Sequence, residues 1–136
     1  MLSKPSAGWS QLKIEDFSFP VSYLTDVPND IIKALTIALK ENVSTAVDID
    51  GESEGTCTIL FNVDENCVSF IYCDHEYEKS RIERTFYELN ILKFAKEIIF
   101  DFERDREEWT EWFCDEEEKC IYDLTELKNI VKEKEQ

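Results

Sequence analysis

The spacing of apolar and polar residues predicts a helix that follows a less regular start. Between residues 29 and 42, apolar side chains recur every three to four positions and crowd one broad side, which is typical of an amphipathic helix. Asn29 or Asp30 can cap its first turn by accepting backbone N–H bonds. Residues 1–28 hold aromatic anchors and all three prolines of the chain, and we expect an irregular lead-in there.

Residues 45–89 follow a period of two, which is typical of β-strands. We expect three strands, joined by a glycine-bounded hairpin loop and a second tight turn, over residues 46–50, 56–63 and 67–73. The third strand is apolar on both faces, so it is expected in the centre of a sheet. Residues 80–89 fit a fourth strand or a helix opened by a Ser80–Glu83 capping box. We prefer the strand, because the meander needs an outer partner.

Helical spacing returns after Asn90. Apolar residues keep this spacing as far as Trp112, and a last amphipathic helix carries the apolar residues from Leu124 to Val131. A chain of 136 residues fits a single domain. The predicted fold class is α+β: a three- to four-stranded antiparallel β-meander with an N-terminal helix and C-terminal helices (residues 90–136) packed on one face.

Charge is the most unusual property of the composition. The chain has 31 Asp and Glu against 15 Lys and Arg, a formal net charge of −16. Residues 45–78 contain no lysine or arginine and hold these carboxylates: Asp48, Asp50, Glu52, Glu54, Asp64, Glu65, Asp74, Glu76 and Glu78. Charge of one sign focuses the potential and steers an oppositely charged partner, although acidity can also serve solubility alone. We predict that this sheet region binds a cationic partner and that nucleic acids and anionic membranes, which the charge repels, are not partners.

Two tryptophans stand beside a second acidic run. Trp109 and Trp112 precede Asp115, Glu116 and two further glutamates. Tryptophan is frequent among the residues that dominate interface energies, and arginine or lysine is a favourable counterpart on the partner. The two tryptophans are also three residues apart on one helix face, as in a packed core. We include Trp109, Trp112, Asp115 and Glu116 in the predicted binding surface, and core packing remains the alternative for the two tryptophans.

No arrangement of residues predicts a catalytic or metal site. The five cysteines lack the spacing of zinc ligands, and His75 is the only histidine. The segment 48–54 departs from a calcium loop, because its glycine is the fourth residue rather than the sixth. Three glycines in all are too few for a glycine-rich phosphate loop. We therefore expect no enzyme activity, no cofactor and no metal.

The cysteines also bear on the compartment. An odd number of cysteines, without a secretory signal, is typical of a reducing environment, so we expect a cytoplasmic protein. No apolar run approaches the roughly 20 residues that span a bilayer. The sequence leaves the oligomeric state open.

The lead-in and the late helix carry a resemblance. Tyr23-Leu24-Thr25-Asp26-Val27-Pro28 opens the first helix, and the motif Trp109–Phe113 closes a later one. This arrangement resembles small acidic bacterial proteins that are encoded beside polymorphic toxin genes. Such proteins look like immunity proteins of contact-dependent toxin systems, which act in the cytoplasm and cover a toxin's active site. The resemblance implies a cognate toxin domain as the partner and brings no catalytic motif.

These observations predict an immunity protein that neutralises a toxin. Nuclease toxins are basic because they hold a polyanion, so the acidity of this chain favours a nuclease as the target. Two alternatives belong to other classes. A nucleic-acid mimic that inhibits a DNA-binding protein would space its carboxylates like phosphates, and a metal-dependent hydrolase would hold its metal with carboxylates.

Overall fold

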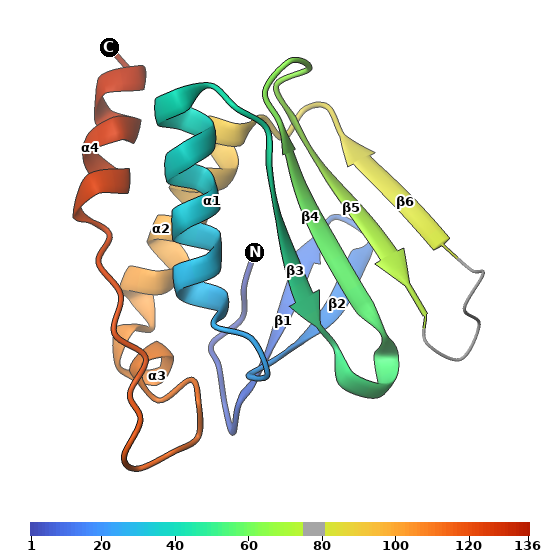
Figure 1. Ribbon diagram of the computed structural model, residues 1–136, viewed down its shortest axis with the longest axis vertical. Coiled ribbons are helices and arrows are strands. Elements are labelled where there is room, and N and C mark those ends of the chain that lie inside the picture. Colours follow the sequence, from blue (N-terminus) through green and yellow to red (C-terminus); the bar gives the residue numbers. More distant parts are fainter. Residues whose placement is uncertain (75–80) are drawn as a thin grey trace.

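The computed structural model describes residues 1–74 and 81–136, without the side chains of residues 81 and 82. The fold is α+β, as predicted, with two antiparallel sheets and helices packed beside them (Figure 1). The elements in chain order are β1 (Trp9–Ile14), β2 (Phe17–Ser22), α1 (Val27–Glu41), β3 (Thr45–Asp50), the 3₁₀ turn η1 (Glu52–Glu54), β4 (Thr56–Asn62), β5 (Cys67–Cys73), β6 (Arg81–Phe86), α2 (Ile91–Arg104), α3 (Arg106–Thr110) and α4 (Thr125–Lys134).

The lead-in is not irregular, and that prediction is wrong. Strands β1 and β2 pair antiparallel, with Leu12 opposite Phe19, and both side chains are buried. Apolar residues recur at every second position on either side of a tight turn, where Glu15 has a φ of 53°. Pro20 is tolerated because a two-stranded sheet has only edge strands, so its missing N–H need not break a ladder.

Helix α1 begins two residues earlier than predicted and has a different cap. The Asp26 side chain accepts a hydrogen bond from the Asn29 backbone N–H at 3.3 Å, so neither Asn29 nor Asp30 is the cap. Pro28 fits the first turn because N–H groups there have no partner within the helix. The helix ends at Asn42, which adopts the left-handed conformation.

The four-stranded sheet has the order β3-β4-β5-β6, with antiparallel neighbours throughout. The prediction that residues 67–73 form a central strand is confirmed, and so is the fourth strand, now bounded as residues 81–86. One face carries Ile59, Phe61, Val68 and Phe70, which are buried against the helices. Figure 1 shows the helices on this one side of the sheet, as expected.

The β1–β2 hairpin packs on the same face of the large sheet as the helices do. The ring of Phe17 lies 5.2 Å from that of Phe70, and the ring of Phe19 lies 5.4 Å from that of Tyr72. Aromatic pairs at these separations add to the stabilisation from burial. The hairpin thereby covers part of the inner face of the sheet, and its open end brings the start of β1 and the end of β2 together, with Trp9 opposite Ser22.

The predicted helix from Ile91 to Trp112 is interrupted at Asp105, between α2 and α3. Aspartate is a poor residue for a helix interior because its carboxylate competes for nearby donors. Here the Arg104 guanidinium binds it at 2.8 Å. Arg104 also pairs with the buried Asp101, which accepts the Leu2 backbone N–H at 2.8 Å. This network fixes the first residues of the chain against α2.

Candidate functional site

The carboxylates predicted as one binding surface lie at different places on the sheet. Asp50, Glu52, Glu54 and Asp74 gather at the end of the sheet where β3 turns into β4 and where β5 ends, whereas Asp64 and Glu65 form the β4–β5 turn. Antiparallel strands send successive turns to opposite ends, and a seven-residue strand separates the two by about 20 Å. Asp48 lies midway along β3, exposed, and accepts the Thr58 hydroxyl at 2.7 Å. Glu76, Glu78 and His75 lie outside the described residues.

The two tryptophans are part of the core. Trp109 and Trp112 are both 0% exposed, and their rings lie 5.1 Å apart. Trp109 also meets Phe102 edge to face at 5.0 Å. Their placement at a binding surface is therefore wrong, and core packing, the open alternative, is what the structure has. The two side chains share one helix face, and that face points into the core.

Three other apolar side chains are exposed together at one end of the molecule. Trp9, Tyr23 and Leu24 are 39%, 38% and 55% exposed. The backbone N–H of Tyr23 donates to the Gly8 carbonyl at 2.9 Å. Gly8 has a φ of 78°, and a Cβ there would lie 2.6 Å from the Tyr23 ring and 3.2 Å from the Cys114 sulfur. Only glycine fits this contact, which joins the start of β1 to the loop after α3.

The loop between β3 and β4 borders Trp9, Tyr23 and Leu24 on one side. The Ser22 hydroxyl donates to the Glu52 carboxylate at 2.6 Å, and the Glu52 backbone N–H donates to Asp50 at 2.6 Å. Glu52 has a φ of 56°, a conformation that costs a non-glycine residue free energy. Gly51 lies against the Phe19 ring, where a Cβ would come within 2.6 Å. These contacts hold the acidic loop against the end of β2.

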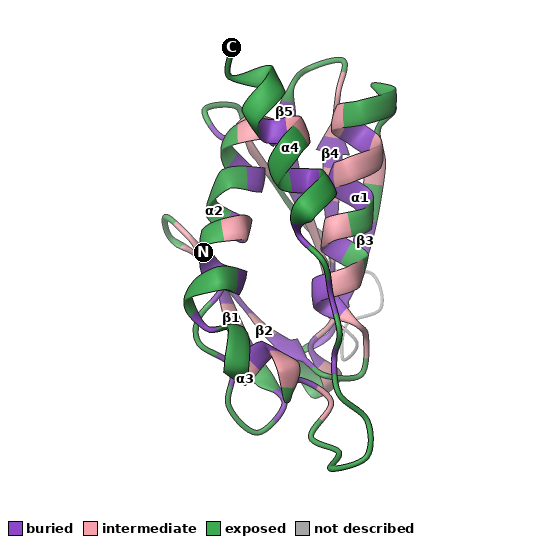
Figure 2. Cartoon of the chain, turned by 90° about the vertical axis from the view of Figure 1, so that its left-hand side faces the viewer, coloured by how far each residue is buried: buried purple, intermediate pink, exposed green. Residues whose placement is uncertain are grey.

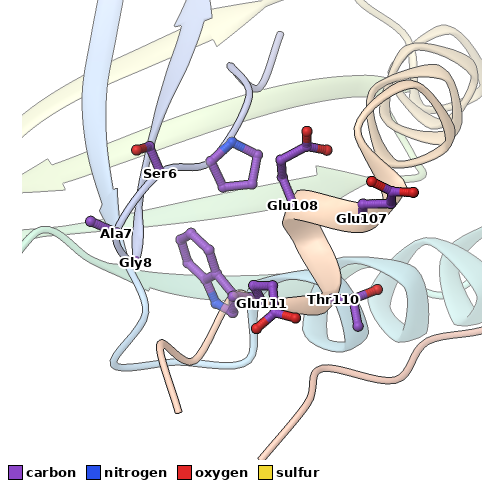
Figure 3. Close-up of a pocket in the computed structure, with 9 residues that line it drawn as sticks. Ser6, Ala7, Gly8, Glu107, Glu108, Thr110 and Glu111 are labelled. Atoms are coloured by element: carbon purple, nitrogen blue, oxygen red, sulfur yellow. The ribbon is translucent and has the colours of Figure 1, made fainter. Parts of the chain in front are cut away.

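On the opposite side of these apolar residues, helix α3 and the residue after it contribute further carboxylates. Glu107, Glu108 and Glu111 border a pocket of about 520 Å³ whose other wall is the segment from Pro5 to Gly8 (Figure 3). Beyond α3, residues 114–119 are exposed without interruption, and Figure 2 shows this loop projecting from the body of the protein. Trp112 anchors the base of that loop, because its indole N–H donates to the Thr25 carbonyl at 2.9 Å.

We call this region the acidic end. It consists of the exposed Trp9, Tyr23 and Leu24, flanked by Asp50, Glu52 and Glu54 on one side and by Glu107, Glu108, Glu111, Asp115, Glu116, Glu117 and Glu118 on the other. Lys4 and Lys119 lie close by, and each pairs with one of its glutamates, at 3.3 Å and 2.7 Å. The acidic end therefore unites two acidic segments that are about sixty residues apart in sequence.

Half of these carboxylates (Asp50, Glu52, Glu54, Asp115 and Glu116) were predicted from the sequence, whereas the apolar residues between them were not. A signal was present in β1, where Trp9 shares the polar strand face with Gln11 and Lys13 while Leu12 takes the buried face. A large aromatic on the wet face of a strand is an informative exception. The signal was lost because the lead-in was not recognised as a strand.

The buried thiols in this chain are not poised for chemistry. Burial raises the pKa of Cys57 to about 12. Burial and the Asp26 carboxylate raise the pKa of Cys120 to about 12, so neither is a thiolate near neutrality. Among residues 1–74 and 81–136 no three histidine, cysteine or acidic side chains converge as a metal site would require.

Comparison with protein-family models, with curated proteins and with solved structures found no match to this chain. In the described ranges, no helix has both the length and the apolar character that crossing a membrane requires. Function is therefore inferred from the acidic end itself.

Proposed function

We propose that this protein binds a basic toxin domain, a nuclease, through its acidic end and neutralises it by covering the active site. The observation that carries the proposal is the position of Trp9, Tyr23 and Leu24 between two acidic segments. The resemblance to immunity proteins of polymorphic toxin systems supports a toxin as the partner. The protein then acts as a cytoplasmic inhibitor without catalysis.

The electrostatic part of the proposal follows from the target. A nuclease must hold a polyanion, so its cleft is lined by lysine and arginine. Carboxylates at the acidic end can occupy the positions of phosphates, and their field raises the rate of association with such a cleft. The net charge of −16 adds to this steering over longer distances at low salt.

The apolar residues supply what charge alone does not. Tryptophan and tyrosine at the centre of an interface, shielded from water by a rim, dominate binding energy in many complexes. Trp9 and Tyr23 can also stack on arginine side chains of the partner. A ring of carboxylates around these side chains therefore combines affinity with a preference for basic surfaces.

The segments of the acidic end are held in place before any partner arrives. Gly8 packs against Tyr23 and Cys114, and Ser22 holds Glu52. A surface whose loops are already fixed loses less conformational entropy on binding. This favours a tight complex, which an inhibitor of a toxin requires.

The test begins with the partner. The tagged protein, expressed in the organism that encodes it, should recover a cationic protein domain. Expression of that domain alone should arrest growth, and co-expression of the wild-type protein should restore it. The affinity should fall steeply between about 50 mM and 0.5 M salt. A partner that is not toxic, or binding indifferent to salt, contradicts the proposal.

Matched variants locate the surface. Asp115→Asn with Glu116→Gln removes two charges from the acidic end, and Asp64→Asn with Glu65→Gln removes the same two charges from the opposite end of the sheet. The first pair should weaken toxin binding about tenfold and slow association, whereas the second should change affinity by less than about twofold. Equal losses for both pairs would show that only the overall charge matters.

A further inference from the structure

Strand β3 is an open edge of the four-stranded sheet. It pairs with β4 along residues 45–50, and on its outer side no backbone hydrogen bond to another element occurs within the described residues. In an antiparallel edge strand, alternate N–H and C=O groups point away from the sheet and can receive a further strand. The lysines or prolines that block many edges do not occur in its sequence, Thr-Ala-Val-Asp-Ile-Asp.

A groove runs along this edge. It lies between α1 and β3, has a volume of about 570 Å³, and is lined on the helix side by Ala34 and Ile37 and on the strand side by residues 45–48. Thr25 closes one end of it. The Thr25 hydroxyl is shielded from solvent and has no hydrogen-bond partner among the residues that the structure describes.

The charges of the groove favour a basic occupant. Its ionisable residues are Asp30, Asp48 and Lys33. Burial and then the neighbouring Asp26 raise the pKa of Asp30, while Lys33 opposes them, so its carboxylate would gain from a further cation. Because Thr25 directly follows Leu24, the end of the groove that Thr25 closes lies next to the acidic end.

We propose that β3 receives an extended, basic segment of the partner protein as an added strand. The inference rests on the proposed function for the chemistry of the partner, and it adds the mode of binding. A strand in this position alternates between two environments. Every second side chain faces Ala34 and Ile37, whereas the intervening ones lie beside Asp48 on the open face. The segment that fits alternates apolar and basic residues.

A second copy of this chain is a poorer occupant. Pairing β3 with its own copy would bring Asp48 and Asp50 near the same residues of the other chain. Like charges directly across a strand pair are destabilising. The net charge of −16 on each chain adds to the repulsion.

The proposal can be tested with synthetic peptides and the isotope-labelled full chain. One ten-residue peptide alternates lysine and valine, a second has the same net charge but lysine, leucine and alanine in helical order, and a third alternates glutamate and valine. Amide chemical shifts are followed during each titration. The lysine–valine peptide should perturb the amides of residues 45–50 in a saturable way, whereas the helical peptide should perturb only the acidic end and the glutamate peptide neither.

Two variants make the result specific. Asp48→Lys should weaken the lysine–valine peptide about fivefold or more, and Asp64→Lys, the same change in the β4–β5 turn, should have less than a twofold effect. Shifts confined to β6, or concentration-dependent shifts of β3 without peptide, would overturn the proposal, the second by showing self-association. Shifts at the acidic end alone would overturn strand addition and leave the proposed function standing.

Discussion

Replacing Trp112 by phenylalanine is expected to destabilise the protein more than the same replacement of Trp109. Both tryptophans are 0% exposed and in contact with each other, so the two changes remove similar atoms from the same part of the core. They differ in hydrogen bonding. The Trp112 indole N–H donates to the Thr25 carbonyl at 2.9 Å, whereas the buried Trp109 indole N–H has no partner within residues 1–74 and 81–136.

The magnitude follows from this difference. Trp112→Phe loses one buried hydrogen bond, a cost of about 1 kcal/mol, because the Thr25 carbonyl keeps the Val27 N–H as a second donor at 3.0 Å. Trp109→Phe removes an unsatisfied donor and regains roughly 1–3 kcal/mol of its desolvation penalty. With the packing cost common to both, Trp112→Phe should be less stable than Trp109→Phe by about 2–4 kcal/mol.

Urea unfolding followed by far-ultraviolet circular dichroism measures the difference without relying on tryptophan fluorescence. At a slope of about 2 kcal/mol/M, the two midpoints should differ by about 1 M or more. Equal midpoints, or a lower midpoint for Trp109→Phe, would refute the reasoning. Either result would mean that the Trp109 N–H has a partner after all, such as a buried water.

Three further outcomes are expected. Ser22→Ala should lower the free energy of unfolding by about 1.5–3 kcal/mol, measured in urea, because it removes a charge-assisted bond to the partly buried Glu52. Iodoacetamide at pH 8 should modify the exposed Cys114 first, and Cys120, whose pKa is raised to about 12 by burial, only on unfolding, as peptide mass spectrometry would show. Burial also raises the pKa of Tyr122 to about 12. The stability that its neutral phenol confers is therefore present below pH 10 and lost as the pH rises through about 12. Tyr122→Phe should make the urea midpoint depend less on pH between those values.

The parts of the fold that could be predicted from sequence are those whose signal is local. The period of two in residues 45–73 gave the three strands, and the need for an outer partner gave β6. The β1–β2 hairpin has the same period and could have been found, but Pro20 and the aromatic residues obscured it. The break at Asp105 could not, because it depends on Arg104, Asp101 and the start of the chain coming together in three dimensions.

The candidate site shows where sequence proximity misleads. Nine carboxylates that are close in sequence were assigned to one surface, yet the meander that was itself predicted sends Glu52 and Asp64 to opposite ends. Conversely, Glu52 and Asp115 are far apart in sequence and flank the same apolar side chains. Helix periodicity placed Trp109 and Trp112 on one face but could not say whether that face points to the core or to a partner.

The charge of the acidic end should cost stability, and that cost can be measured. Like charges packed at one end repel each other in the folded state more than in the expanded chain. Asp115→Asn with Glu116→Gln is therefore expected to raise the urea midpoint by up to about 0.3 M at low salt, and the rise should shrink in 1 M salt, where screening acts within about 3 Å. Asp64→Asn with Glu65→Gln, at the other end of the sheet, should give a smaller rise and should not weaken toxin binding. A lower midpoint for the first pair would show that these carboxylates stabilise the fold, and their presence would then need no partner to explain it.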